Sequence, residues 1–332
     1  MNKLLWIVPL LLMSGLLTGC LNDDDDDDLL GNWIKRSDFE GVTRSGAVSF
    51  TLGDFAYVGL GYDGDDYLKD FWRYDPNSDF WQRVDDFPGL GRTAAVAFSV
   101  DGKGYVGTGF NGDLDEEFAD FWSFAPNAPV GQMWERKADF QGSARYNAVA
   151  FALNGKGFVG TGYDGNYLKD FYQYLPENDS WEQIISIGGS KREAAISFVI
   201  DNKAYVGTGR SNGVYEFDFW SYDDGTGTWT RLLDIDEEDD YQIDRHGAVA
   251  FEMDGFGYVA TGSTGATLNT VWEYNPGDDT WEEKTEIEGS RRLEAVAFTL
   301  QGRAFVTTGS NGSFRFDDIW EFFPLEEYDE DD

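Results

Sequence analysis

The chain has 332 residues, with 62 acidic against 25 basic side chains and a formal net charge of −37. A protein this acidic repels nucleic acid phosphates and anionic lipid headgroups, so we expect no nucleic acid partner. One Cys and one His exclude internal disulfides and Cys-rich or His-rich metal centres. No phosphate loop, nucleophile elbow or EF-hand loop occurs, so we expect no cofactor and no metal.

The first predicted segment is a leader. Residues 1–3 carry one positive charge, and residues 4–17 form an apolar run too short to span a bilayer comfortably. This pattern predicts a signal peptide over residues 1–19. The sequence Leu-Thr-Gly-Cys, which ends at Cys20, resembles the lipobox of bacterial lipoproteins. The resemblance implies cleavage before Cys20, lipidation of its thiol and attachment to a membrane through the acyl chains.

An acidic tether follows, which we assign to residues 20–30. Its six adjacent Asp residues, 23–28, repel one another, so they form an extended, solvated segment. The run is either a plain spacer or a sorting signal. It resembles the acidic stretches that export some Gram-negative lipoproteins to the outer face of the outer membrane, which implies exposure on the cell surface. Residues 325–332 form a second acidic tail.

Between the tails, 40 Gly and 17% aromatic residues are typical of short strands joined by tight turns. About three hundred residues exceed one simple sandwich, so a repeat is expected. A pattern recurs six times, each beginning with Arg, with Ala three and Phe six positions later and Gly at the end of a second strand. The repeats begin at Arg44, Arg92, Arg145, Arg192, Arg245 and Arg292, at spacings of 48, 53, 47, 53 and 47 residues.

The tryptophans give the number of strands. Each repeat has an aromatic residue at a third-strand position, and all but the last have Trp at a fourth-strand position. The final repeat ends without that Trp, while Trp33 stands alone near the N-terminus. We therefore expect the N-terminal strand around Trp33 to complete the last repeat and close a ring.

The order Arg, Gly, Tyr-Asp-Pro and Trp, in repeats of about fifty residues, resembles kelch repeats over residues 31–324. One departure is Gly-Thr-Gly in most repeats, where the family usually has Gly-Gly. The resemblance implies an all-β, six-bladed β-propeller with four antiparallel strands per blade. The first strands, such as Ala-Val-Ala-Phe, are expected to be continuously apolar and to line the axis of a monomeric propeller.

Candidate ligand-binding residues lie where the first strands begin. In kelch proteins the repeated Arg often contacts the partner, and six of them would form a positive funnel for a carboxylate. The alternative is structural, with each Arg paired inside its blade. The neighbours that vary between repeats are a second set, because symmetry does not require them. The candidates are Arg44, Arg92, Arg145, Arg192, Arg245, Arg292, Tyr146, Glu193, His246, Glu294, Tyr62, Tyr163 and Arg210.

Three functions remain open. The first is a non-catalytic surface module that binds a glycan or a protein through these loops, since aromatic rings beside Arg, Asn and acids suit sugar recognition. The second is an enzyme like the kelch sialic-acid mutarotases, with Glu193 or Glu294 moving protons and Arg192 or Arg292 holding a carboxylate. The third is a structural or assembly component of the cell envelope. Catalytic residues stay unassigned.

Overall fold

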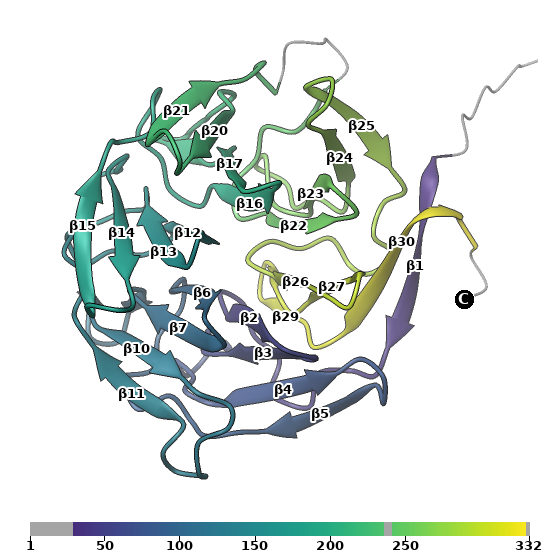
Figure 1. The fold of residues 1–332 in the computed structure, drawn as a ribbon. Coiled ribbons are helices and arrows are strands. Elements are labelled where there is room, and N and C mark those ends of the chain that lie inside the picture. The colour runs from purple at the N-terminus through teal and green to yellow at the C-terminus, as the bar shows by residue number, and fades with distance from the viewer. Residues whose placement is uncertain (1–28, 236–240, 330–332) are drawn as a thin grey trace, which may run out of the picture.

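The computed structural model describes residues 29–235 and 241–329, so the predicted signal peptide, Cys20 and the first part of the tether lie outside the described residues. Six antiparallel sheets of four strands each surround a central axis (Figure 1). The chain is a six-bladed β-propeller. The fold predicted from the repeats is therefore confirmed. Within the described ranges, no helix has the length and apolarity needed to cross a membrane.

Blades are numbered here in chain order. Blade 1 comprises β2 (Val48–Leu52), β3 (Phe55–Gly59), β4 (Phe71–Asp75) and β5 (Phe80–Arg83). Blade 2 comprises β6 (Val96–Val100), β7 (Lys103–Gly107), β10 (Phe121–Phe124) and β11 (Trp134–Lys137). Blade 3 comprises β12 (Val149–Leu153), β13 (Lys156–Gly160), β14 (Phe171–Leu175) and β15 (Ser180–Ile184).

The second half of the ring repeats this order. Blade 4 comprises β16 (Ile196–Ile200), β17 (Lys203–Gly207), β20 (Trp220–Asp223) and β21 (Thr228–Arg231). Blade 5 comprises β22 (Val249–Met253), β23 (Phe256–Ala260), β24 (Val271–Asn275) and β25 (Thr280–Lys284). Blade 6 comprises β26 (Val296–Leu300), β27 (Arg303–Thr307), β30 (Ile319–Glu327) and β1 (Leu30–Arg36).

Three blades carry an extra two-stranded hairpin between their second and third long strands. Blade 2 has β8 (Phe110–Asn111) with β9 (Glu116–Glu117), and blade 4 has β18 (Arg210–Ser211) with β19 (Val214–Tyr215). Blade 6 has β28 (Ser310–Asn311) with β29 (Phe314–Arg315). The odd-numbered blades have an irregular loop at this place, so hairpins and loops alternate around the ring.

The first and second strands of each blade meet at a two-residue turn. Asn154 and Gly155 both have positive φ angles, 50° and 74°. This conformation fits a type I′ turn, whose twist matches the twist of paired strands and which favours Asn, Asp and Gly. Short pairs of Asn, Asp, Gln or Gly residues in the sequence therefore fix the register of the two inner strands.

Ring closure occurs in blade 6, where the N-terminal β1 is the outermost strand and pairs antiparallel with β30 (Figure 1). Trp33 lies at this seam and is fully buried. Its ring stacks on Phe322 at a centroid distance of 4.5 Å, and its Nε1 donates to the Thr285 carbonyl at 3.2 Å. Because Thr285 follows the last strand of blade 5, Trp33 joins the two ends of the ring, as its position in the sequence predicted.

The hydrophobic core consists of six clusters, one between each pair of neighbouring blades. Between blades 6 and 1, Phe298 packs with Tyr74 and Trp81, all of them nearly inaccessible to solvent. The aromatic rings fill the space between blades that widens away from the axis. Both faces of each sheet are therefore buried, which explains the high aromatic content.

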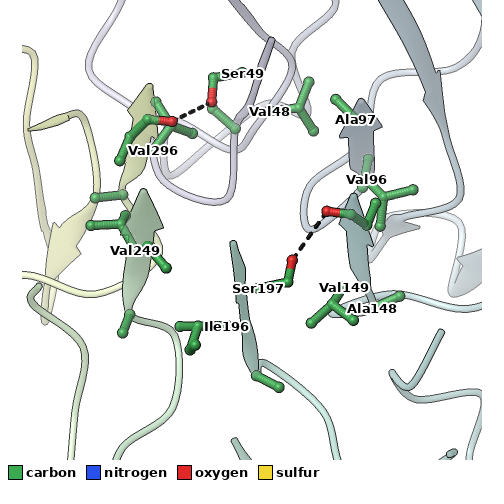
Figure 2. Close-up of a pocket in the computed structure, with 18 residues that line it drawn as sticks. Val48, Ser49, Val96, Ala97, Ala148, Val149, Ile196, Ser197, Val249 and Val296 are labelled. Atoms are coloured by element: carbon green, nitrogen blue, oxygen red, sulfur yellow. Dashed lines mark hydrogen bonds between the residues drawn. The ribbon is translucent and has the colours of Figure 1, made fainter. Parts of the chain in front are cut away.

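The first strands of the blades line an axial cavity of about 230 Å³ (Figure 2). Their sequences are apolar as predicted, but burial along each strand alternates, because every second side chain points into a blade interface. Ser49 and Ser197 donate to the carbonyls of Ala297 and Ala150, at 2.9 and 3.1 Å, on the preceding blade (Figure 2). These bonds satisfy edge-strand carbonyls that would otherwise face the cavity.

Candidate functional site

All six repeated arginines lie inside the blades, with at most 1% of each exposed. Five of them form an ion pair with an Asp just before the third long strand of the same blade. Their NH1 groups also donate to the carbonyl that follows the second strand, as Arg92 does to Thr108 at 2.9 Å. The partners of Arg44, Arg92, Arg145, Arg192 and Arg292 are Asp70, Asp120, Asp170, Asp218 and Asp318.

The arginine ring expected at the channel mouth is therefore absent from the surface, and the geometry favours the structural alternative. A blade interior buries the guanidinium, and the carboxylate and carbonyls around it use its N–H groups. Burial alone would raise the pKa of Asp120, but the hydrogen bond and charge of Arg92 lower it overall. The pKa of Asp70 and of Asp318 is lowered in the same way by Arg44 and Arg292. These arginines hold the second and third strands together.

The residue two positions after each Arg has a positive φ, and the six residues at this position form a closed ring of backbone hydrogen bonds. Each residue donates its N–H to the carbonyl of its counterpart in the preceding blade, at 2.8–3.0 Å. The members are Gly46, Ala94, Asn147, Ala194, Gly247 and Glu294. The ring fixes the mouth of the channel, and only Asn147 and Glu294 contribute polar side chains there. A ligand is expected to lie on this mouth, because the cavity below is lined only by small Ala, Ser, Val and Ile residues, whereas polar side chains that can orient a ligand stand at the mouth.

The residue directly after each Arg pairs with the residue that follows the second-strand Gly, through an isolated antiparallel bridge. In blade 4 this bridge brings Glu193 beside Arg210, with Oε1 and Nε 3.1 Å apart. Asn147 of blade 3 donates its side-chain amide to the other Glu193 oxygen at 3.1 Å. Glu193 is buried, while Arg210 is 39% exposed and keeps part of its guanidinium open to solvent.

His246 joins this cluster from blade 5. Its Nδ1 lies 2.9 Å from the Ser263 carbonyl, and its Nε2 lies 3.0 Å from Arg210 NH1. A carbonyl accepts and a guanidinium donates, so the ring is the neutral tautomer with the proton on Nδ1. Burial lowers the pKa of His246, and the positive charge of Arg210 lowers it further. Glu193, Arg210 and His246 thus form one continuous chain across blades 4 and 5.

The neutral state of His246 can be tested directly, because the protein contains one histidine. We expect its imidazole NMR signals to titrate below pH 6.5, and Arg210→Gln to move the midpoint upward. The folded pKa lies below the unfolded value, so the stability that the neutral ring contributes is lost as pH falls below 6.5. A midpoint at or above 6.5 in the native protein would contradict the lowered pKa of His246.

Glu294 lies at the channel mouth in blade 6. Part of this residue is exposed to solvent. The protein groups around its carboxyl remove water from it, and this desolvation raises the pKa of Glu294. A hydrogen bond with Ser45 and the charges of Arg210 and Arg315 oppose the rise, while Glu193 adds to it. Two acids and two cations thus lie close together at the mouth.

Aromatic side chains flank the polar cluster on two sides. In blade 3, Tyr146 lies edge-on to Tyr163, and Tyr163 lies edge-on to Tyr167. Burial, together with the negative charge of Glu193, raises the pKa of Tyr146 to about 12, so its hydroxyl stays protonated and can donate. In blade 1, the ring of Tyr62 stacks on that of Tyr67 at a centroid distance of 4.7 Å, and the Arg315 guanidinium lies over the Tyr62 ring, 4.8 Å from its centroid.

The structure thus brings together Glu193, Arg210, His246, Glu294 and Tyr146 from the predicted set, with Tyr62 and Tyr163 beside them. It adds side chains that were not among the predicted candidates: Tyr67, Tyr167, Tyr215 and Arg315. The first two belong to a repeated Tyr-Leu-Lys-Asp, a signal visible in the sequence. Arg315 has no counterpart in another repeat, so only the hairpin of blade 6 reveals its position.

Metal ligation is not supported at the mouth. In residues 29–235 and 241–329, no group of three or more His, Cys, Asp or Glu side chains is arranged to hold an ion. The acids present are instead held by Arg210, Asn147 and Ser45. The cluster is suited to hydrogen bonding and proton transfer.

Comparison with known proteins gives the fold. No family model matches the chain, and no curated protein matches its sequence. Many solved structures share the architecture, among them that of YjhT, with a TM-score of 0.73. The match covers 85% of this chain and 95% of YjhT at 16% identity. The shared feature is the propeller. At this identity the likeness carries no function, so function must be argued from the site.

Proposed function

We propose that this protein is a surface lipoprotein that binds a carbohydrate on the channel mouth, without chemical conversion. The main support is the partly exposed chain of Glu193, Arg210 and His246, which presents donors and acceptors between two groups of tyrosines. Carbohydrates are recognised by this combination, in which rings stack on the sugar and polar groups bind its hydroxyls. The hydrogen-bonded ring below gives the ligand a fixed floor.

The cellular location is part of the proposal and rests on the sequence pattern alone. Lipidation of Cys20 would hold the propeller on the outer membrane, and residues 20–30 would separate it from the bilayer. The acidic body would be repelled by anionic headgroups, so the loop face would stay free of the membrane. Radiolabelled palmitate incorporation, compared with Cys20→Ser, tests the anchor independently of any ligand.

The binding proposal is tested on the unlipidated chain from residue 21 onward. We expect a glycan array to give specific hits, and the same sugars to raise the thermal midpoint. Arg210→Gln and Glu294→Gln should abolish both effects, whereas Arg83→Gln, which removes an exposed ion pair on blade 1, should leave them unchanged. If no neutral or acidic sugar binds, the carbohydrate proposal is wrong, and pull-down from the native membrane then tests a protein partner.

A second candidate function is interconversion of sugar anomers, similar to that of the sialic-acid mutarotases. It is favoured by the raised pKa of Glu294 beside Arg210 and Arg315. The reaction opens the sugar ring when a base removes the proton from the anomeric hydroxyl and an acid protonates the ring oxygen, and it then closes on the other face. Arg192 and Arg292 are buried in their blades, so a sugar carboxylate would instead meet Arg210 or Arg315.

The two candidates differ in one measurement. Proton NMR of a freshly dissolved anomer follows its equilibration, with and without the protein. Catalysis predicts an equilibration that is faster than the uncatalysed rate and that Glu294→Gln slows. A binding module predicts the uncatalysed rate for every sugar that the protein binds.

A further inference from the structure

Blade 5 departs from the other five blades at one buried position. In each other blade an Asp carboxylate lies between the buried Arg and a third-strand aromatic residue. In four of them the Trp Nε1 donates to that Asp at 2.6–2.8 Å. Blade 5 retains Arg245 and Trp272 but has Thr270 where the Asp stands. Four blades therefore show how a buried Arg and a Trp indole together hold a carboxylate, and blade 5 has the same two donors without the Asp.

The two donors of blade 5 are left without a carboxylate partner among the described residues. Arg245 is fully buried and bonds only backbone carbonyls, those of Gln242, Ile243, Thr261 and Thr270, at 2.6–3.3 Å. Burial lowers its pKa to about 10, and the more distant charges of Asp244 and Glu283 offset this only in part. The buried Trp272 Nε1 has no hydrogen-bond acceptor in the described part of the chain.

A pocket of about 350 Å³ opens at this position, lined by both Thr270 and Trp272. Its other lining residues are Gln242, Asp244, Thr264, Leu268 and Glu283. An unsatisfied buried indole N–H costs free energy, and so does a buried guanidinium without an anion. Because Thr270 lines the pocket, the pocket reaches the position at which the other blades place their own carboxylate, although Arg245 is not among its lining residues.

We propose that blade 5 contains a site for a small carboxylate, which takes the position of the missing Asp side chain between Trp272 and Arg245. The carboxylate would accept from Trp272 Nε1 and from the Thr270 hydroxyl, and it would lie against the positive charge of Arg245. The remainder of the molecule would contact Leu268 and the indole face. The pocket has room for a short organic acid.

Asp244 and Glu283 limit which anions enter. Both side chains line the pocket, and their negative charges would repel a second negative charge on the bound molecule. Burial raises the pKa of Glu283, with a further contribution from Glu286, although Arg245 acts against it. A monocarboxylate is therefore favoured over a dicarboxylate or a phosphate. The site lies inside blade 5 and is independent of the carbohydrate proposed at the channel mouth.

The test uses sodium acetate as the probe, with sodium chloride at equal ionic strength as the reference. In protein labelled with ¹⁵N at the indole nitrogens, the Trp272 signal, assigned with Trp272→Phe, should shift in acetate and reach saturation. Thr270→Asp places a carboxylate of the chain itself in the site. Its Trp272 signal should already be shifted and should no longer respond, and its thermal midpoint should exceed that of the native protein.

A matched variant extends the test to another blade. Asp120→Thr in blade 2 recreates the arrangement of blade 5 around Arg92 and Trp122, so acetate should shift the Trp122 indole signal and restore part of the lost thermal midpoint. The proposal is wrong if the chemical shift of the native Trp272 indole signal is the same in acetate as in chloride. It is also wrong if Thr270→Asp responds to acetate as the native protein does. The native titration decides even where a variant fails to fold.

Discussion

Replacing Trp33 by Ala is expected to lower the thermal midpoint by about 6–10 °C, because the substitution opens the seam that closes the ring. Truncating a buried Trp typically costs about 3–5 kcal/mol, and a domain of this size loses roughly 2 °C per kcal/mol. Here the loss includes the stack on Phe322 and the hydrogen bond to the Thr285 carbonyl, which join blades 6 and 5. Differential scanning calorimetry measures the midpoint.

The control for this prediction is Tyr328→Ala, because Tyr328 lies near the same seam but is 51% exposed. We expect its midpoint to remain within about 1 °C of the native value, since surface substitutions rarely exceed 0.5 kcal/mol. The thermal midpoint of Trp33→Phe should lie between those of Trp33→Ala and Tyr328→Ala, because this variant keeps an aromatic ring but loses the indole donor. Equal midpoints for Trp33→Ala and Tyr328→Ala would refute closure of the ring by the N-terminal strand.

The second large effect is expected from Asp120→Ala in blade 2. The substitution leaves the Arg92 guanidinium buried without its carboxylate and removes the acceptor of the Trp122 indole. Removing one partner of a buried ion pair costs about 3–5 kcal/mol, because the other charge is left uncompensated. Urea unfolding followed by tryptophan fluorescence measures the change. The exposed pair of Arg83 and Asp86 supplies the control, where Asp86→Ala should cost about 0–1 kcal/mol.

A double replacement separates the charge from the packing. Arg92→Met combined with Asp120→Leu removes both charges, so its loss of stability should be smaller than that of Asp120→Ala alone. A double variant that is less stable than the single one would mean that the ion pair itself, rather than the unpaired charge, dominates the free energy.

Acid should act through the same pairs. The pKa of Asp70, Asp120 and Asp318 is lower in the folded protein than the ordinary value of 3.8. Each carboxylate therefore contributes stability that is fully present above about pH 4 and is lost as pH falls through 3.8 toward the folded pKa. The free energy of unfolding should decline steeply in this range, and Asp120→Ala should flatten that decline.

We expect function at the positions where one blade differs from the other five. The five buried Arg–Asp pairs keep their blades alike, so a ligand cannot distinguish one of these blades from another through them. At the channel mouth, by contrast, Glu193, His246 and Glu294 each occur once, and in blade 5 Thr270 replaces the repeated Asp. A repeat protein can change such positions without losing its fold, because the strands and blade interfaces do not depend on them.

The sequence by itself determined the number of blades, their strand order and the strand that closes the ring. These features repeat at fixed spacing, and each depends on local turns and on the burial of a few aromatic side chains such as Trp33. The sequence also predicted Glu193, His246 and Glu294 from the neighbours that vary after each Arg, and Arg210 from the facing loops. The structure brings these side chains together at the channel mouth.

Only the tertiary structure decided what the repeated arginines do. A repeated Arg at the start of a strand is compatible with a surface ring or with an internal pair, since the direction of its side chain depends on a partner about 26 residues away. The Asp that binds each paired Arg and the position of Arg315 depend on contacts between distant segments, and so does the lack of an acceptor for Trp272 Nε1 among the described residues. Local sequence patterns do not predict such contacts, because they form only when the folded chain brings distant segments together.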